Sequence, residues 1–453
     1  MMKHRIPAFL LAVLLAVTAA GCSAQEPEDS AGLPESSAGT AVRSEAFYPA
    51  EAGYTDFDGS LVQGWSGWNA DGTFTFQNRN TLTTLSRENQ VLEAITLPEE
   101  ALPGSEYSLD RSDDYILALS NPAGMNEPFG VVYYTDSGTV CLANLTLFDR
   151  QGNPVRQYPR SQVYGYDEND QKICLLPCPE GETVTDTYEL SVNTLHWLDG
   201  HTAILDCHAW IFLYDFEADS GRILDDMSEI VKHYGKFGVY YGSQMGGVVD
   251  GTYYYLTRRE SDPISGYTLW AADADGAREL LDGQRFWHLF AAKDGLVLVD
   301  DINPADPESD SRVWYLPTGS TQPTLVWSGD FSLYITEADQ IAFISWAWSL
   351  DSSVLYSYDP VTGALSSRDL GECIQINSLF TLVRDGSLRY YYSQFKDGER
   401  TSRVYDTAAD TTTPLTRFDG NLYVSWLSPD GRYWVEQDPS TDDPRLRVSR
   451  WEY

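Results

Sequence analysis

Short runs of aromatic and β-branched residues recur along the chain on both sides of a tight polar turn. In WNADGTFTF and VVDGTYYYL, an Asp-Gly pair separates two such runs. Because Asp and Gly both tolerate positive φ, Asp-Gly between apolar runs predicts a β-hairpin. The turns stand at Asp71, Asp199, Asp250, Asp294, Asp385 and Asp430, with weaker versions at Asp113 and Asp339. The best helix candidate, DMSEIVKHY, is two turns at most.

The turns are regularly spaced. From Asp250 the steps to the next four turns are 44, 45, 46 and 45 residues, and the step from Asp71 to Asp113 is 42. A strand-built repeat of this length is typical of the four-stranded blades of a β-propeller. Eight turns predict an all-β propeller of eight four-stranded blades. Seven blades is the alternative, because the step from Asp113 to Asp199 is 86 residues.

A second signature follows most turns: a strand that ends in an aromatic residue and Asp, then a polar turn. It occurs as FLYDFEADSGRIL, TLWAADADGAREL, VLYSYDPVTGAL and RVYDTAADTTTPL. The Tyr-Asp-x-x-Thr-Gly form resembles the blade turns of quinoprotein-like, TolB-like and WD40-like bacterial propellers. The resemblance spans most of residues 60–453. It implies the fold and leaves the family and the function open.

The last repeat contains three strands, NLYVSWL, RYWVEQ and LRVSRWEY. Propellers commonly complete such a blade with a strand from the other end of the chain, and residues 46–60 are placed to supply it. We therefore assign residues 46–453 to a propeller closed by pairing of the N-terminal strand with the last blade. Irregular insertions near 121–138 and 160–185 interrupt it, and the second fits no strand template. Long insertions project from one face and often carry function.

The N-terminus has the layout of an export signal. Lys3 and Arg5 precede the apolar stretch FLLAVLLAV, and small residues lead to Cys22. Ala-Ala-Gly-Cys resembles the bacterial lipobox, which implies a lipoprotein signal peptide over 1–21 and palmitate or another acyl chain on Cys22. Residues 22–45, rich in Ser, Ala, Glu, Pro and Gly, predict a flexible tether. Ordinary secretion with an incidental cysteine is the alternative.

Composition restricts the partners. Without Lys3 and Arg5, the mature chain has 28 basic against 67 acidic residues, a formal charge near −39. Binding of nucleic acid depends on Lys and Arg to neutralise phosphate, so nucleic acid is excluded. The acidity is spread along the chain and indicates a solubilising surface, with attraction for cations or basic partners as the alternative. The 29 Tyr, 13 Trp and 17 Phe favour strands.

Five cysteines remain beside Cys22. They are Cys141, Cys174, Cys178, Cys207 and Cys373. Cys174 and Cys178 form the candidate disulfide, a local staple in an oxidising compartment. Inert buried thiols are the alternative. A metal site would need two further ligands, and none stands at a suitable spacing.

Catalytic signatures are absent from the sequence, including the Gly-x-Ser-x-Gly elbow of hydrolases and the Ser-x-Asp-x-Gly-x-Thr-Trp box of sialidases. His196, His201, His208 and Asp206 fall in one repeat. His201 and His208 are an odd number of residues apart, so a regular strand would point them to opposite faces. Acidic loops at 273–276 and 301–310 do not complete a calcium loop. We predict no metal, no cofactor and no catalytic residue, and assign Tyr253–Tyr255 and Tyr390–Tyr392 to blade packing.

These observations predict a membrane-anchored binding or scaffold module on the extracytoplasmic face of the cell membrane, without catalysis. Its ligand would be a protein, a peptide or a glycan. An enzyme that acts on extracellular glycans is the first alternative and would show convergent carboxylates at the channel mouth. A sensor component is the second.

Overall fold

The computed structural model describes the chain between residues 55 and 450, with gaps. The gaps are residues 57–65, 70, 106, 121–129, 186–190, 235–241, 260–265, 282–283, 285, 293, 301–310, 330, 334–340, 346–353, 371–374, 385–386, 397–398, 416–427, 429–431 and 438–444. The predicted signal peptide 1–21, Cys22, the tether 22–45 and Cys373 lie outside the described residues. All described residues belong to one compact unit, Val42–Tyr453.

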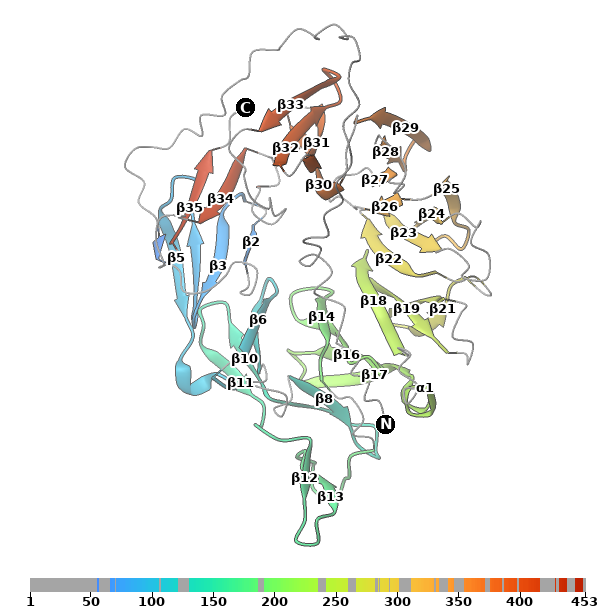
Figure 1. Cartoon of the computed structure of the whole chain (residues 1–453). Helices are drawn as coiled ribbons and strands as arrows, with labels where there is room; N and C mark the ends of the chain where they lie inside the picture. Colours follow the sequence, from blue (N-terminus) through green and yellow to red (C-terminus); the bar gives the residue numbers. More distant parts are fainter. Residues whose placement is uncertain are drawn as a thin grey trace, which may run out of the picture. The chain divides into compact units, whose positions relative to one another are not determined.

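Six sheets each consist of four antiparallel strands that follow one another along the chain (Figure 1). The first three are β2 (Ser66–Trp68), β3 (Phe74–Asn78), β4 (Thr81–Leu85) and β5 (Val91–Thr96); β14 (Thr194–Trp197), β15 (Thr202–Asp206), β16 (Trp210–Asp215) and β17 (Ser220–Asp226); and β18 (Gly242–Val249), β19 (Thr252–Arg258), β20 (Thr268–Asp273) and β21 (Gly276–Glu279). The other three are β22 (His288–Ala292), β23 (Gly295–Asp300), β24 (Arg312–Pro317) and β25 (Thr324–Ser328); β26 (Phe331–Leu333), β27 (Ile341–Ser345), β28 (Val354–Asp359) and β29 (Ala364–Asp369); and β30 (Gln375–Arg384), β31 (Ser387–Lys396), β32 (Glu399–Asp406) and β33 (Thr411–Leu415).

The remaining strands form two less regular sheets and two hairpins. One sheet has the order β11-β10-β7-β6, with β6 (Tyr107–Arg111), β7 (Tyr115–Ser120), β10 (Leu145–Asp149) and β11 (Pro154–Gln157). The terminal sheet joins β1 (Thr55–Asp56), β35 (Arg445–Arg450) and β34 (Tyr433–Gln437). The hairpins are β8 (Val131–Tyr134) with β9 (Val140–Ala143), and β12 (Tyr164–Tyr166) with β13 (Lys172–Cys174).

The structure corrects the prediction of eight four-stranded blades. Six sheets have four consecutive strands as predicted, not eight. The sheet that contains β6 is interrupted, because the β8–β9 hairpin stands between β7 and β10. The terminal sheet has three described strands, and the predicted strand NLYVSWL lies outside the described residues. The spacing of the turns predicted an ordinary blade for each of these two sheets, because it shows that a repeat is present and not how many strands the repeat contains or how they pair.

The N-terminal segment pairs with the last strand. Thr55 lies opposite Leu446, and Asp56 lies opposite Arg445. The Asn89 side chain reinforces this junction: its amide nitrogen donates to the Val448 carbonyl at 2.6 Å, and its oxygen accepts from the Val448 amide at 2.5 Å. The two ends of the described chain are therefore joined by backbone and side-chain hydrogen bonds.

Apolar side chains pack between neighbouring sheets. Buried clusters join successive sheets in chain order from the β2–β5 sheet to the β26–β29 sheet. A further cluster joins the first and last sheets through Phe74, Phe76, Val435 and Val448. Figure 1 shows the sheets arranged around a common centre. The inner strands of the sheets joined by two clusters thus bury both faces, which explains why they read as continuous aromatic and β-branched runs.

The two repeated signatures both have a backbone role. At the Asp250-Gly251 turn both residues have positive φ, 49° and 72°, as the hairpin prediction requires. In the second signature the Asp side chain accepts backbone amides of the following turn. The Asp215 carboxylate accepts from Glu217 and Ala218, each at 2.9 Å. Such Asx turns replace backbone hydrogen bonds that the strand end leaves unmade.

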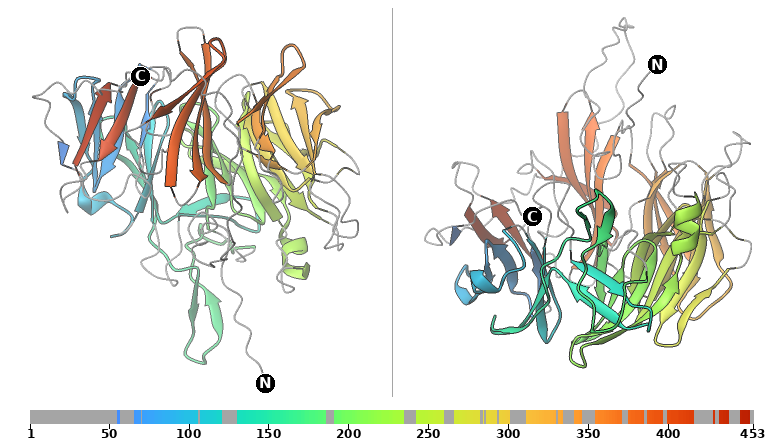
Figure 2. Two further views of the ribbon diagram at one scale, coloured as in Figure 1. Left: turned by 45° about the horizontal axis from the view of Figure 1, so that its top comes forward. Right: turned by 90° about the horizontal axis from the view of Figure 1, so that it is seen from below.

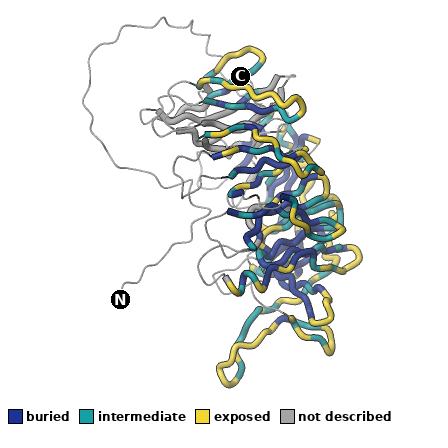
Figure 3. The backbone as a smooth tube through the Cα atoms, turned by 90° about the vertical axis from the view of Figure 1, so that its right-hand side faces the viewer, coloured by how far each residue is buried: buried dark blue, intermediate teal, exposed yellow. Residues whose placement is uncertain are grey.

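The insertion between β7 and β14 contains two hairpins of opposite character. β8–β9 is buried and packs on β16 and β17, where the Tyr134 hydroxyl donates to Asp226 at 3.0 Å. β12–β13 projects away from the sheets (Figures 1 and 2), and its residues are mostly exposed (Figure 3). The expectation that 160–185 fits no strand is wrong, because Tyr164 pairs with Cys174 and Tyr166 with Lys172.

Helical structure in the described part of the chain is slight. It consists of η1 (Glu99–Ala101) and α1 (Ser228–Tyr234). The α1 helix coincides with the helix candidate of the sequence. None of the helices among the described residues has the length and apolar character to cross a bilayer.

Candidate functional site

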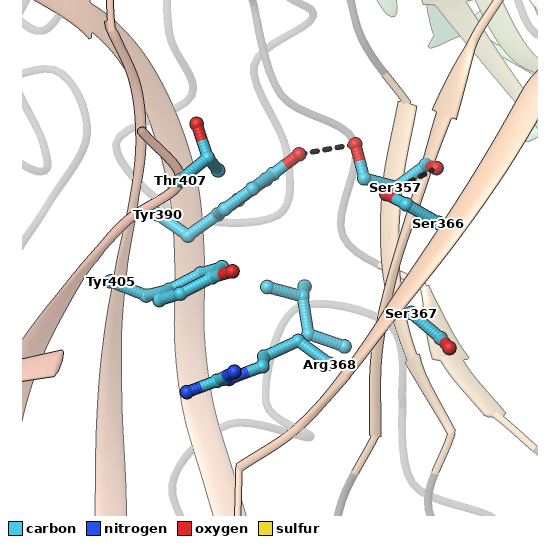
Figure 4. Close-up of a pocket in the computed structure, with 8 residues that line it drawn as sticks. Ser357, Ser366, Ser367, Arg368, Tyr390, Tyr405 and Thr407 are labelled. Carbon is cyan, nitrogen blue, oxygen red and sulfur yellow. Dashed lines mark hydrogen bonds between the residues drawn. The ribbon is translucent and has the colours of Figure 1, made fainter. Parts of the chain in front are cut away.

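A cavity of about 340 Å³ lies between the β26–β29 sheet and the β30–β33 sheet (Figure 4). Both sheets contribute to its lining, together with the turn after β32. The lining residues are Leu355, Ser357, Ser366, Ser367, Arg368, Tyr390, Tyr405 and Thr407. We call this site the Tyr390 cavity. Its volume falls at the small end of the range for ligand pockets.

One wall is a polar patch on strands β28 and β29. Ser357 lies opposite Ser366, and Leu355 lies opposite Arg368. Residues that are directly paired across antiparallel strands point to the same face, so all four share the face that borders the cavity. Leu355 and Ser357 are buried, whereas Ser366 is exposed. The buried part of this wall therefore holds both an apolar side chain and a hydroxyl, and its exposed part carries a further hydroxyl.

The other wall is a pair of tyrosines on β31 and β32. Tyr390 lies opposite Tyr405, and their rings stack with centroids 6.3 Å apart and planes 13° apart. Tyr390 is only 1% exposed, and its hydroxyl is hydrogen-bonded to the Ser357 hydroxyl of the facing sheet (Figure 4). This hydrogen bond joins the two walls at the base of the cavity.

Arg368 brings a positive charge to the rim. Its guanidinium carbon lies 5.2 Å from the centroid of the Tyr405 ring, a distance at which the cation is attracted to the ring face. Its Nη1 atom lies 2.7 Å from an Asp410 carboxylate oxygen. The Arg368 side chain is 39% exposed and that of Asp410 is 65% exposed. Because guanidinium carries five N–H donors, one ion pair does not use up its binding capacity.

The hydroxyls of the cavity are proton donors. Burial raises the pKa of Tyr390 to about 12. Burial, followed by the hydrogen bond to Asp410, also raises the pKa of Tyr405. Both phenols are therefore protonated at neutral pH. Among the described residues that line the cavity there is neither a carboxylate nor an imidazole, and the chemistry that these residues offer is hydrogen bonding and charge pairing.

A second polar cluster lies between the β14–β17 sheet and the β18–β21 sheet, and we call it the Asp206 network. The Asp206 carboxylate accepts from the Tyr253 hydroxyl at 2.5 Å, the His208 amide at 2.8 Å and the Ser243 hydroxyl. Asp206 is 5% exposed and Tyr253 is 1% exposed. The cluster is closed to solvent and each carboxylate oxygen has a donor, which indicates a structural role.

A neighbouring carboxylate continues this pattern. The Tyr255 hydroxyl donates to Asp225, and Arg259 forms an ion pair with the same carboxylate. The rings of Tyr253 and Tyr255 stack with centroids 5.5 Å apart. The prediction that these tyrosines serve blade packing agrees with their burial, and the structure adds that their hydroxyls satisfy two buried carboxylates.

The histidines of the same repeat do not converge on one point. The His196 ring lies beside the Tyr253 ring at a tilt of 34°, with centroids 5.0 Å apart. His201 lies 3.5 Å from Asp199 at a turn, and the His208 ring contacts the Ser243 carbonyl at 3.1 Å. Across the described ranges, no three His, Cys, Asp or Glu side chains are grouped to hold a metal ion.

The structure places four of the cysteines. Cys174 is exposed at the end of β13, and Cys178 and Cys141 are half-buried. Cys207 is buried. All four carry free thiols in this structure, and the Cys174–Cys178 disulfide stays a prediction. Lipidation of Cys22 also stays a prediction, because that residue lies outside the described range.

The sequence interpretation missed the Tyr390 cavity. Tyr390 was assigned to the packing between blades, and Tyr405 was noted only as part of the second signature. Arg368 was not singled out, although it lies in a segment otherwise rich in serine, LSSRD. A basic residue beside hydroxyls in a strongly acidic chain is the signal that could have drawn attention to it.

Comparison with known proteins supports the architecture. No family model matches the sequence, and no curated protein matches it. Among solved structures, the dipeptidyl peptidase 4 of Porphyromonas gingivalis matches with a TM-score of 0.53 at 12% identity, over 86% of this chain and 58% of that one. The fold is a β-propeller. This propeller thus spans less than two thirds of the peptidase chain.

Two further structures resemble the propeller less closely. A eukaryotic initiation factor matches with a TM-score of 0.49 at 10% identity, over 89% of this chain and 90% of that one. The Dos1 propeller matches with a TM-score of 0.44 at 11% identity, over 90% of this chain and 96% of that one. Identities this low concern the fold alone, so the function is argued from the site.

Proposed function

We propose that the chain is a membrane-anchored binding module on the extracytoplasmic face, and that the Tyr390 cavity holds an acidic glycan without catalysis. The observation that carries this proposal is the lining of the cavity. Its described residues combine one guanidinium, several hydroxyls and an aromatic pair. Attachment to the membrane rests on the lipobox-like sequence that ends at Cys22.

The position of Arg368 favours a carboxylate-bearing ligand. Arg binds carboxylates through two parallel N–H···O bonds, and the Nη1 atom of Arg368 already lies 2.7 Å from one carboxylate oxygen, that of Asp410. Asp410 is exposed, so it can turn toward solvent when a ligand carboxylate takes its place. The cation–π contact with the Tyr405 ring, 5.2 Å from the guanidinium carbon to the ring centroid, favours this position of the guanidinium at the rim.

The hydroxyls favour a sugar over an apolar ligand. Ser366, Ser367 and Thr407 border the cavity together with the two phenols. Hydroxyls both donate and accept hydrogen bonds, which matches the mixed donors and acceptors of a sugar ring. A cavity of about 340 Å³ accommodates one end of a glycan chain rather than a protein surface.

A binding experiment tests this proposal. The full chain in detergent is presented to an array of uronate-containing glycans, the same glycans with reduced carboxyls, and short peptides. Uronate glycans are expected to bind at least about tenfold more tightly than their neutral counterparts, since a hydrogen bond to a charged group contributes about 1.5–3 kcal/mol. Equal binding of both forms, preference for peptides, or release of cleaved glycan would contradict the proposal.

Arg368→Ala with a matched control locates the site. Arg312 makes similar contacts elsewhere: it lies 5.5 Å from the Trp314 ring and 2.6 Å from Asp300, outside the cavity. Arg368→Ala should lose about tenfold in affinity for uronate glycans, and Arg312→Ala should lose none. Equal losses in both variants would show that the general charge of the chain, not the cavity, governs binding.

A further inference from the structure

Three cysteines belong to the insertion that contains the two hairpins. Cys141 is on β9, Cys174 ends β13, and Cys178 follows four residues later. Their exposure falls from the hairpin to the body, because Cys174 is exposed while Cys178 and Cys141 are half-buried. The three thiols therefore lead from solvent toward the buried β8–β9 hairpin.

Tyr133 links Cys141 to the segment that carries Cys178. Tyr133 lies directly opposite Cys141 in the β8–β9 register, so their side chains share one face with Cβ atoms about 5 Å apart. The Tyr133 hydroxyl donates to the carbonyl of Pro177. Since Pro177 immediately precedes Cys178, this hydrogen bond holds the Cys178 backbone against the face of the hairpin that bears Cys141.

Cys178 also makes a contact within its own segment. Its thiol donates to the Leu176 carbonyl at 3.9 Å. The thiols also act on one another electrostatically. Burial and then the charge of Cys178 raise the pKa of Cys141, and burial and then the charge of Cys174 raise the pKa of Cys178. Cys178 thus stands four residues from Cys174 in the chain, and the Tyr133 hydrogen bond to Pro177 holds its segment to the hairpin face that bears Cys141.

We propose that these cysteines form a thiol relay, in which Cys178 is the shared partner of two alternative disulfides and the Cys141–Cys178 bond is the stable product. Disulfides form through attack of a thiolate on a disulfide sulfur. The exposed Cys174 reacts first with an external disulfide, such as oxidised glutathione, and releases one thiol of it. Cys178 then displaces the second external thiol and forms the Cys174–Cys178 bond.

The second step moves the bond inward without further oxidation. The Cys141 thiolate attacks the Cys178 sulfur, the Cys141–Cys178 bond forms, and Cys174 leaves as a thiolate that takes up a proton. In total, two cysteine thiols lose two protons and two electrons, and one external disulfide becomes two thiols. Cys174 returns to the reduced state at the surface.

The two disulfides differ in what they restrain. The Cys174–Cys178 bond spans four residues and closes a loop within one segment. The Cys141–Cys178 bond spans 37 residues and encloses β10 to β13, so it fastens the base of the projecting hairpin to the buried one. A longer closed loop removes more conformational freedom from the unfolded chain, which favours this bond as the end product.

Disulfide mapping by mass spectrometry tests the relay. The full chain in detergent is reduced, then incubated with oxidised glutathione, and free thiols are alkylated before digestion. In the unmodified sequence, Cys141–Cys178 should predominate with Cys174 alkylated. Cys141→Ser should stop the reaction at Cys174–Cys178, and Cys178→Ser should leave Cys174 bound to glutathione without an internal disulfide. Cys207→Ala should not alter the pattern.

Two variants test the order of the steps and the role of Tyr133. Cys174→Ser should still form Cys141–Cys178, but about tenfold more slowly, because the exposed entry point is gone. Tyr133→Phe removes the hydrogen bond to Pro177 and should shift the product toward Cys174–Cys178, which a purely structural role would not do. The proposal is overturned if Cys141 remains alkylated after prolonged oxidation, or if Cys174–Cys178 predominates in the unmodified sequence.

Discussion

The Asp206 network and the Tyr390 cavity occupy equivalent places, each between two neighbouring sheets of the propeller, but one is closed and the other is open. Both are built around stacked tyrosines, with an arginine and an aspartate nearby. In the network, the carboxylate of Asp206 is 5% exposed and receives three donors. At the cavity, the Asp410 side chain is 65% exposed and pairs with Arg368 at the rim.

The difference comes from where the acidic residue lies along the strand. Asp206 ends β15, next to the centre of its sheet, so the facing sheet covers it. Asp410 belongs to the turn between β32 and β33, which the facing sheet does not cover. An inner carboxylate therefore fastens two sheets together, whereas a carboxylate in an outer turn stays accessible to solvent.

The largest expected effect follows from removal of the inner carboxylate. Asp206→Ala leaves the Tyr253 and Ser243 hydroxyls and the His208 amide without their acceptor in a closed interface. We expect a loss of about 4 kcal/mol in the free energy of unfolding, because each buried unsatisfied group costs about 1–3 kcal/mol. Asp410→Ala should lose under about 1 kcal/mol. Urea unfolding of the two variants measures this contrast, and equal losses would contradict it.

The next largest effect is expected at alkaline pH, where ionisation of the buried tyrosines lowers the free energy of unfolding. Burial raises the pKa of Tyr390 to about 12 and that of Tyr253 well above 10. Since the folded state favours the protonated phenol, this stability is fully present below pH 10, the unfolded value, and is lost as pH rises toward the folded value. For Tyr390 the loss approaches about 3 kcal/mol near pH 12.

Unfolding by urea from pH 9 to beyond pH 12 checks the alkaline prediction. Tyr390→Phe should lower the dependence on pH by part of its total, and Tyr253→Phe should lower it more at the alkaline end, because the buried Asp206 carboxylate further disfavours the Tyr253 phenolate. A pH dependence that both variants leave unchanged would show that other groups cause it.

A glycine beside the network should give a smaller effect. A Cβ atom at Gly246 would lie 2.0 Å from the Tyr253 hydroxyl oxygen, so Gly246→Ala must displace the ring from Asp206. We expect a loss of about 2 kcal/mol, in the range of overpacking in a filled core. Gly67→Ala is the control, since no atom lies within 4 Å of its Cβ position. A difference under about 0.5 kcal/mol would mean that Tyr253 can move freely.

The smallest effect on stability is expected at the proposed binding site. Arg368→Ala removes a half-exposed ion pair and the contact with Tyr405, and such surface pairs contribute about 0–1 kcal/mol. Arg259→Ala should cost more, because Asp225, its partner, is buried. Thermal unfolding compares the two variants. A large loss for Arg368→Ala would assign this residue to folding rather than to binding.

The repeated turns and hairpins could be predicted from the sequence, whereas the candidate site could not. Asp-Gly turns and the Tyr-Asp signature depend on local chemistry, so the hairpins at Asp250 and the Asx turn at Asp215 could be predicted from a few adjacent residues. The Tyr390 cavity depends on the distance between two sheets, which no local pattern encodes. The strands of the β6–β11 sheet could not be predicted either. The hairpin inserted between β7 and β10 lengthens the spacing between two turns, and the spacing does not show which strands pair.

The junction between the chain ends has a consequence for the order of folding. Asn89 and Val448 are 359 residues apart, yet they share two hydrogen bonds. Contacts between residues this far apart in sequence form slowly, because the chain loses the conformational entropy of a long loop before the contact stabilises it. The terminal sheet cannot be completed until the last strand has been synthesised, so the earlier sheets must stay soluble as an open arc. Hydrogen exchange at the Val448 amide would report how often the finished ring reopens at this seam.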